Sequence, residues 1–476
     1  MTYLDHVEAN KEEMIETLAE VIRMKSVLND PVYLPEGEVY PFGEDVQNVY
    51  KRTLDIGEEF GFETTNIDNY GGHIEFKGED AKETFAIIGH LDVVPEGSDW
   101  EHAPYGAEIV DNWMYGRGTT DDKGPVIACL YAMKALKQAN IVPKKNIRLI
   151  LGLDEETGWK GMDYYLSKTK APDFGITPDG EFPAINGEKG IIYFSFARKF
   201  SENKNSKGLE LTSIKAGNAP NMVPDFARAV IKCEDRDAYD NIKELGSLYR
   251  KESNYKINFK GIGKSLEITT HGVSAHGASP ESGLNAISIM MKFLGKLNFA
   301  FEETNDFVCF YNKNIGFEVD GKSLGINLYD EASGPLTVNV GMMEMTNKAV
   351  QLVVNARYPV SFTEEDIYSG LNILLKKEKI GLIKEKLQKP IYKEPDDPMI
   401  KTLMDVYQNH TGDIDSKPLV IGGGTYARAT KNIVAFGGAF PDDEDRMHQK
   451  NERINLDKFV LMTKIYAEAI YKLTCI

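Results

Sequence analysis

The residues best suited to chemistry in this chain are histidines and carboxylates that follow short apolar runs. The first such run, residues 85–94, contains His90 and Asp92. Side chains two positions apart in an extended strand point the same way, so we expect the Asp92 carboxylate beside the His90 ring. A carboxylate there can hold one imidazole nitrogen and leave the other free for a metal ion. A hydrogen-bonded His–Asp pair that only ends a strand would give the same pattern.

A second group of candidates lies in the polar loop YGRGTTDDKGP, residues 115–125. Asp121 and Asp122 stand just before a predicted helix, where either one could cap the helix N-terminus. A carboxylate presented there could instead bridge two metal ions through its two oxygens. The spacing alone leaves both interpretations open.

Three adjacent carboxylates follow the second apolar run, which begins at residue 146: Asp154, Glu155 and Glu156. At a buried strand end they would repel one another unless a cation or a proton intervenes, whereas a solvated acidic loop is the plainer alternative. Alternation sends Glu155 and Glu156 to different sides. One of them could therefore bind a metal ion while the other acts as a general base.

Two further candidates complete a donor set. Asp179 ends another short apolar run, and His448 lies in a polar loop before the last helix, a position that also suits a surface histidine. The set combines oxygen and nitrogen donors, as a two-metal hydrolase needs. Its members are His90, Asp121, Glu156, Asp179 and His448. Since the set contains no thiolate, it excludes a structural cysteine-type zinc site.

The elements expected to position these residues form an α/β arrangement. The apolar runs at 85–94 and 146–156 are typical of strands covered on both faces. Residues 125–140 between them have helical spacing and begin with Pro125, which suits a first helical position. This order predicts a βαβ unit and a mostly parallel sheet, and functional groups gather where the strands of such sheets end.

The pattern changes from about residue 191, where alternating segments predict antiparallel strands interspersed with helices. We therefore expect a catalytic α/β domain in two parts, residues 1–186 and 386–476. An inserted α+β domain would occupy residues 187–385. The chain should close with a helix in INLDKFVLMTKIYAEAIYKL.

Composition narrows the class of protein. The 476 residues are 42% hydrophobic and 27% charged, and the formal net charge is −18. Such a charge disfavours duplex nucleic acid and anionic membrane surfaces as partners. No run approaches the ~18 apolar residues of a membrane span, and the N-terminus does not resemble a signal peptide. The four cysteines, Cys129, Cys233, Cys309 and Cys475, lack CxxC spacing, so we expect reduced thiols and a cytoplasmic location.

The motifs together resemble the two-zinc metallopeptidase superfamily of aminoacylases, carboxypeptidase G and the DapE and ArgE deacylases. Within it, the chain is most similar to the PepV-like dipeptidases of Gram-positive bacteria. The resemblance extends along essentially the whole chain in family order. It is carried by GHLDVVPEG, YGRGTTDDKGP, LDEETGWKGMDYY, TPDGEFPAINGEKG, NMVPD, HGVSAHGASPESGLNA, NARYP, IGGGTYAR and GAFPDDEDRMHQKNE.

The resemblance implies a role for each metal ligand. His90 would bind one Zn²⁺ ion and Asp179 would complete its ligands, Asp121 would bridge both ions, and Glu156 and His448 would bind the second. Mn²⁺ or Co²⁺ could replace Zn²⁺, because the same ligands suit all three ions. Asp at position 179 is typical of the dipeptidase and aminopeptidase branches, whereas deacylases and carboxypeptidases tend to carry Glu.

The resemblance also implies catalytic and substrate-binding residues. Asp92 would orient His90, Glu155 would be the general base and acid, and His276 in SAHG would polarise the scissile carbonyl in preference to His271. Substrate binding would fall to the following residues: Asn221, Arg357, Gly423, Gly424 and Thr425. Asn355 in NARYP departs from relatives that often have an acid there, which weakens the assignment of the neighbouring Arg357. The remaining histidines, His6, His73, His102 and His410, are expected at the surface or in local hydrogen bonds.

The expected activity is metal-dependent hydrolysis of unblocked dipeptides by a monomer whose inserted domain acts as a lid. An aminoacylase, deacylase or carboxypeptidase of the same superfamily is the nearest alternative. A non-enzymatic metal- or peptide-binding protein is a second, which the complete ligand set and Glu155 argue against. A nucleic-acid partner is a third, and the net charge disfavours it.

Overall fold

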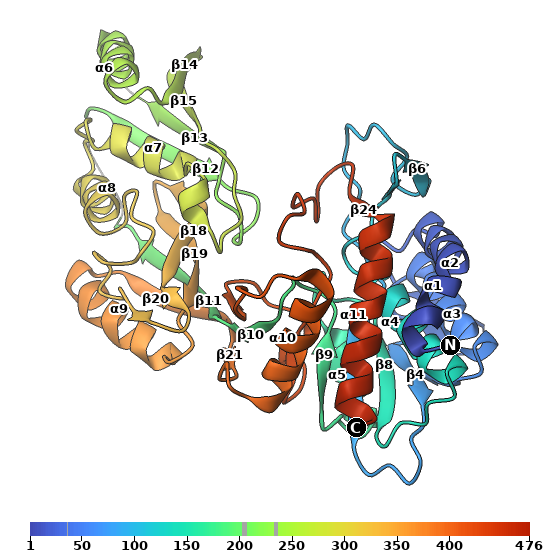
Figure 1. The fold of residues 1–476 in the computed structure, drawn as a ribbon. Coiled ribbons are helices and arrows are strands. Elements are labelled where there is room, and N and C mark those ends of the chain that lie inside the picture. Colours follow the sequence, from blue (N-terminus) through green and yellow to red (C-terminus); the bar gives the residue numbers. More distant parts are fainter. Residues whose placement is uncertain (36, 202–206, 233–236) are drawn as a thin grey trace. The chain divides into compact units, whose positions relative to one another are not determined.

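The computed structural model describes residues 1–35, 37–201, 207–232 and 237–476 (Figure 1). Contacts divide the chain into two compact units. The first comprises Met1–Asn186, Lys393–Leu419 and Gly424–Ile476, and the second comprises Gly187–Tyr392 and Val420–Gly423. The second unit is thus inserted within the sequence of the first.

A mixed nine-stranded sheet has the order β21-β10-β23-β9-β5-β8-β4-β3, and β22 also pairs with β10. Its central strands run parallel: β23 (Ile433–Ala435), β9 (Phe174–Thr177), β5 (Thr84–His90) and β8 (Asn146–Gly152). Antiparallel strands flank them on both sides. These outer strands are β3 (Glu63–Ile67), β4 (Gly71–Phe76), β10 (Ile185–Glu188) and β21 (Ile391–Tyr392), and β22 is Leu419–Ile421.

The predicted βαβ unit is present as β5, helix α4 (Lys123–Gln138) and β8. Every residue of β5 is buried, as its continuous apolar sequence predicts for a strand covered on both faces. Helix α4 begins two residues before Pro125 and is buried almost all round, since it contacts β5 and three helices of the first unit. Figure 1 shows α11 (Leu456–Thr474) beside it.

The remaining elements of the first unit surround this centre. Its other α-helices are α1 (Tyr3–Ala9), α2 (Lys11–Arg23), α3 (Glu44–Glu59), α5 (Lys160–Lys168) and α10 (Pro398–Thr411), and η2 (Tyr426–Arg428) is a 3₁₀ turn. A small three-stranded sheet is formed by β6 (Glu108–Val110), β7 (Trp113–Tyr115) and β24 (Arg453–Asn455). The short strands β1 (Val32–Tyr33) and β2 (Val39–Tyr40) pair with each other.

The second unit is built on an eight-stranded antiparallel sheet of order β14-β15-β13-β12-β18-β19-β11-β20. In chain order its strands are β11 (Gly190–Lys199), β12 (Glu210–Ala216), β13 (Phe226–Lys232), β14 (Lys256–Ile262), β15 (Ser265–His271), β18 (Thr337–Thr346), β19 (Ala349–Tyr358) and β20 (Gly381–Gln388). The pair β16 (Tyr329–Asp330) and β17 (Gly334–Pro335) stands apart from it. The helices are α6 (Asp237–Ser253), α7 (Ala286–Leu294), α8 (Glu302–Asn314), α9 (Glu364–Glu378) and the 3₁₀ turn η1 (Pro280–Ser282).

The expected fold class, α/β with an interrupting α+β domain, is confirmed. Each unit has its own hydrophobic core, as an inserted domain requires. Cys129, Cys309 and Cys475 are free thiols, and Cys233 lies outside the described residues. Within the described ranges, no helix is long and apolar enough to cross a membrane.

Candidate active site

The parallel strands at the centre of the sheet deliver three acidic or histidine segments to one edge. His90 is the last residue of β5, Asp154 follows β8 by two residues, and Asp179 follows β9 by two. Because the carboxyl ends of parallel strands lie at the same edge, these segments converge there. The sequence signal that pointed to the site, an apolar run ending in a polar group, is therefore a direct consequence of the topology.

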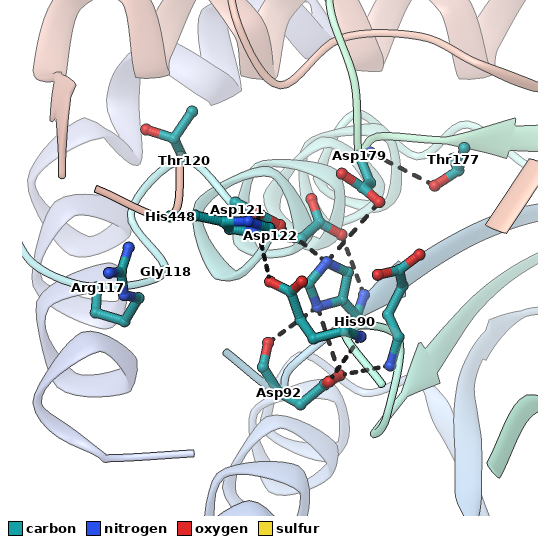
Figure 2. Close-up of polar contacts among 12 residues, drawn as sticks. His90, Asp92, Arg117, Gly118, Thr120, Asp121, Asp122, Thr177, Asp179 and His448 are labelled. Atoms are coloured by element: carbon teal, nitrogen blue, oxygen red, sulfur yellow. Dashed lines mark hydrogen bonds and ion pairs between the residues drawn. The ribbon is translucent and has the colours of Figure 1, made fainter. Parts of the chain in front are cut away.

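The first group of possible metal ligands comprises His90, Asp121 and Asp179, whose ligand atoms all lie within 4.8 Å of one another. His90 Nε2 is 3.0 Å from Asp121 Oδ1 and 3.9 Å from Asp179 Oδ2. Figure 2 shows these side chains turned toward one another. His90 is fully buried, Asp121 is nearly so, and Asp179 is partly exposed.

The second group comprises Asp121, Glu156 and His448. His448 Nε2 is 2.9 Å from Asp121 Oδ2 and 2.9 Å from Glu156 Oε1. Asp121 therefore belongs to both groups and offers a different carboxylate oxygen to each, as a ligand that bridges two ions must. His448 adopts a positive φ of 61° in its loop. The five predicted ligands thus lie together in two adjoining triads.

Asp92 connects the ends of β5 and β8. His90 Nδ1 lies 2.9 Å from the backbone carbonyl oxygen of Asp92, which can only accept, and 3.5 Å from Asp92 Oδ1. The carboxylate itself accepts the backbone N–H groups of Glu155 and Glu156, each at 3.1 Å. Asp92 therefore contacts the His90 ring, as predicted, and also holds the backbone of the glutamate pair, which the sequence did not indicate.

The contacts of Asp122 show whether its side chain caps the N-terminus of α4, one of the alternatives left open by the sequence. It occupies the N-cap position of α4, but no capping hydrogen bond from its side chain is found in the described part of the chain. Its Oδ2 accepts the backbone N–H of His90 at 3.1 Å instead. The carboxylate that a local rule assigns to the helix end therefore supports the strand that carries His90.

The site concentrates negative charge, and the pKa values reflect it. Burial and the charge of Asp179 raise the pKa of Glu155 well above its usual 4.5. Burial and the charge of Asp121 likewise raise the pKa of Glu156. Although desolvation opposes the charged imidazolium, the carboxylates of Asp121 and Glu156 raise the pKa of His448, whose side chain is 53% exposed, to about 11. A cation bound here would relieve the same repulsion that these shifts express.

The buried nitrogen of His90 fits a metal ligand. Among the residues that the structure describes, His90 Nε2 has no hydrogen-bond partner, although it is fully buried. With Nδ1 donating to a carbonyl, a neutral ring would direct the lone pair of Nε2 at the oxygens of Asp121 and Asp179. An imidazole lone pair and carboxylate oxygens converging on one point form the donor set of a divalent cation such as Zn²⁺.

Asn221, His276, Arg357 and Gly423 lie in the second unit, and two of these predicted residues are neighbours. Asn221 accepts the backbone N–H of Gly277 at 2.6 Å, directly beside His276. His276 forms an isolated bridge with Met222. Both His276 and its competitor His271 are exposed, and His271 ends β15 with its ring against Phe226.

Arg357 lies near the end of β19, where it is almost fully buried. Its Nε donates to Asn355 Oδ1 at 3.2 Å and its Nη1 donates to the Gly422 carbonyl at 2.9 Å. Asn355 therefore contacts the guanidinium even though it is not an acid. Of the predicted loop residues, Gly423 belongs to the second unit, whereas Gly424 and Thr425 belong to the first.

Three of the other histidines make hydrogen bonds, of which only that of His102 is local in sequence; the expectation of a surface or locally bonded position is wrong for His73, which is buried. His73 Nδ1 contacts the Tyr165 hydroxyl at 2.9 Å. His102 contacts Glu108 at 2.9 Å, and His410 contacts Glu468 at 2.7 Å.

A buried ion pair beside the site was not predicted. Arg117 Nη1 donates to Glu452 Oε2 at 2.6 Å, and both side chains are almost completely buried. The glycines on either side of Arg117 were the only local signal. Glu452 stands among polar residues of a loop, so its burial could not be inferred from its neighbours in the sequence.

Comparisons with known proteins identify the family of the chain. The model of Peptidase family M20/M25/M40 matches residues 86–472. A Staphylococcus epidermidis protein named "Putative dipeptidase" is 36% identical over 466 residues, covering 97% of each chain. The Bacillus subtilis protein named "Putative dipeptidase YtjP" is 35% identical with the same coverage.

Among solved structures, human carnosine dipeptidase 1 is similar in fold, with a TM-score of 0.57, 17% identity and coverage of 99% of this chain and 98% of that one. The chain belongs to the peptidase family M20/M25/M40. The protein is accordingly a peptidase, a hydrolase of peptide bonds, and the resemblance drawn from its motifs is confirmed at the level of the family.

Proposed function

We propose that the protein is a metal-dependent dipeptidase that hydrolyses the peptide bond of unblocked dipeptides. The observation that carries the proposal is the position of Asp121, whose two oxygens lie 3.0 and 2.9 Å from the imidazole nitrogens of two different triads. The names of relatives that match nearly the whole chain supply the substrate class. Asp at position 179, typical of the dipeptidase branch, is consistent with it.

The two triads would each hold one divalent cation, with Asp121 bridging them. Zn²⁺ suits the mixed imidazole and carboxylate donors, and Mn²⁺ or Co²⁺ could occupy the same ligands. Bound ions would lower the pKa of a water molecule and polarise the scissile carbonyl. Glu155 is proposed to accept the proton of the attacking water and to deliver it to the leaving amine.

The second unit is proposed to act as a lid that contributes substrate contacts. His276 would donate to the oxyanion that develops on the scissile carbonyl. Arg357 and Asn221 would bind the substrate carboxylate, since a guanidinium suits a carboxylate in both charge and geometry. Gly423, Gly424 and Thr425 would add backbone contacts. A lid that binds both termini of a dipeptide would exclude longer peptides, and the protein would act as a cytoplasmic monomer.

One experiment separates this proposal from the nearest alternative. Metal-free protein is reconstituted with Zn²⁺ or Mn²⁺, and amino-acid release is followed from a free dipeptide and from its N-acetylated and C-amidated forms. Cleavage of the free dipeptide alone supports the proposal and shows that both termini are recognised. Preference for the acetylated form would identify a deacylase instead. No cleavage by protein that holds two ions would favour a binding protein.

A further inference from the structure

The buried carboxylate of Glu452 connects the two loops that carry Asp121 and His448. Glu452 follows His448 by four residues and immediately precedes β24, which pairs with β7. Its Oε1 accepts the backbone N–H groups of Gly118 at 3.0 Å, Thr120 at 3.0 Å and Asp121 at 3.2 Å. Figure 2 shows Gly118 and Thr120 on the loop that leads to Asp121.

These contacts engage both oxygens of the carboxylate. Oε1 serves the loop, and Oε2 accepts from Arg117, whose guanidinium also lies 5.3 Å from the Trp100 ring. Gly118 adopts a φ of 90°, a left-handed conformation that favours glycine. Successive N–H groups that converge on one point form an anion-binding concavity, and here the anion is the side chain of Glu452.

The backbone on both sides of Glu452 is also fixed. Gly116 N–H donates to the Glu452 carbonyl at 2.9 Å, and the Thr120 hydroxyl donates to the Arg453 carbonyl at 3.1 Å. Asn451 Oδ1 accepts the Glu101 N–H at 2.9 Å. The loop with Asp121 and the segment after His448 therefore form one hydrogen-bonded body.

We propose that Glu452 is a positioning residue that fixes Asp121 relative to His448 and thereby sets the metal affinity of the triad Asp121–Glu156–His448. The inference rests on the proposed function, since it concerns the ligands of the proposed second ion. An ion pair with Arg117 alone would need only one oxygen of Glu452. The other oxygen, Oε1, accepts the backbone N–H of Asp121, the ligand shared by the two triads.

Two variants test this role. In Glu452→Gln one position of the carboxylate becomes an amide NH₂, which faces either Arg117 or the three N–H donors and can accept from neither. Glu452→Asp keeps the charge but shortens the side chain by one methylene, which moves the oxygens away from their donors. It tests the same role if the glutamine variant fails to fold. The matched control is Glu75→Gln, which removes the negative charge from the Arg148–Glu75 pair (2.8 Å) between β4 and β8, at the opposite end of β8 from Glu156.

The experiment titrates metal-free protein with Co²⁺ and records visible absorption and bound metal, after circular dichroism has established folding. We expect wild type and E75Q each to bind two ions, and we expect the affinity for each ion to be the same in both proteins. The Glu452 variants should bind one of the two ions about 10- to 100-fold more weakly, as is typical when a supporting contact of a metal ligand is lost.

Wild-type affinities for both ions in the folded Glu452 variants would overturn the positioning role. So would an equal loss in E75Q, because the effect would then come from stability alone. The failure of the proposed function is a different result: it is seen in the wild type, as the binding of fewer than two ions.

Discussion

The Asp92 carboxylate accepts the backbone N–H groups of Glu155 and Glu156 at 3.1 Å each, and so joins the end of β5 to the turn after β8. Asp92, the residue predicted to orient His90, thus also fixes the position of the backbone of Glu155 and Glu156. Asp92 is nearly inaccessible to solvent, so water cannot replace a lost contact. Its substitution should affect catalysis through both neighbours.

We therefore expect Asp92→Asn to lower kcat/KM about 10- to 100-fold, the range typical of groups that orient metal ligands. The measurement is dipeptide hydrolysis at saturating metal. Asp173→Asn is the control, because Asp173 Oδ2 accepts the backbone N–H of Thr84 at 2.9 Å at the other end of β5. Asp173→Asn should stay close to wild type. Equal losses in the two variants would contradict a specific role for Asp92.

Substitutions of Glu155 and Glu156 should have different effects, the first on turnover and the second on metal binding. Glu155→Gln should keep two bound ions and lose about 10²- to 10⁴-fold in kcat, the usual contribution of a general base. Glu156→Gln should lose metal instead, because Glu156 Oε1 faces His448 Nε2 at 2.9 Å in the second triad. Metal content by atomic spectroscopy and kcat are measured on the same samples. A loss of metal in Glu155→Gln with retention in Glu156→Gln would mean that the two roles are exchanged.

The parts of the fold that could be predicted are those in which local pattern and topology agree. The apolar runs that became β5 and β8, and the spacing that became α4, follow from burial on both faces of a parallel sheet. The position of His90 and of the acidic residues at strand ends follows from the same topology. The α4 start was placed two residues too late, because Pro125 is not its first residue.

Contacts between distant segments could not be predicted. Asp122 occupies the N-cap position of α4, as the local sequence predicts. Its side chain, however, accepts the backbone N–H of His90, which lies on the separate strand β5. Glu452 belongs to a polar loop, yet it is fully buried. Its carboxylate accepts hydrogen bonds from Arg117 and from three backbone N–H groups of the loop that leads to Asp121. Neither partner is near in the sequence. Pairing of polar groups in the interior depends on which segments the fold brings together, and local pattern does not contain that information.

His276 should matter for turnover far more than its neighbour His271. If His276 donates to the developing oxyanion, His276→Ala should lower kcat about 10²- to 10³-fold, as the loss of one such donor does elsewhere. His271→Ala is the matched control, because His271 is also exposed and lies five residues earlier on the same segment. The measurement is kcat for a free dipeptide at saturating metal, with metal content verified. Near-normal turnover in His276→Ala would remove it from the mechanism.

His73 should make the stability of the first unit sensitive to acid. Burial, together with the charge of Arg148, lowers the pKa of His73 from 6.5 to about 3. The folded state therefore binds fewer protons than the unfolded state between these values, and stability falls as the pH decreases from about 6.5 toward 3. At pH 5 the loss from this group is about 2 kcal/mol relative to pH 7.5. His73→Gln should remove that part of the pH dependence.

The measurement is urea unfolding at pH 7.5 and pH 5 for the wild type, His73→Gln and Tyr165→Phe. The Tyr165 hydroxyl contacts His73 Nδ1 at 2.9 Å, so Tyr165→Phe removes the hydrogen bond but leaves the imidazole buried. It should cost about 1 kcal/mol at both pH values and keep the acid sensitivity. His73→Gln should instead narrow the difference between the two pH values. If His73→Gln and the wild type lose the same free energy of unfolding at pH 5, the acid sensitivity has another origin, because the buried imidazole is the group that the variant removes.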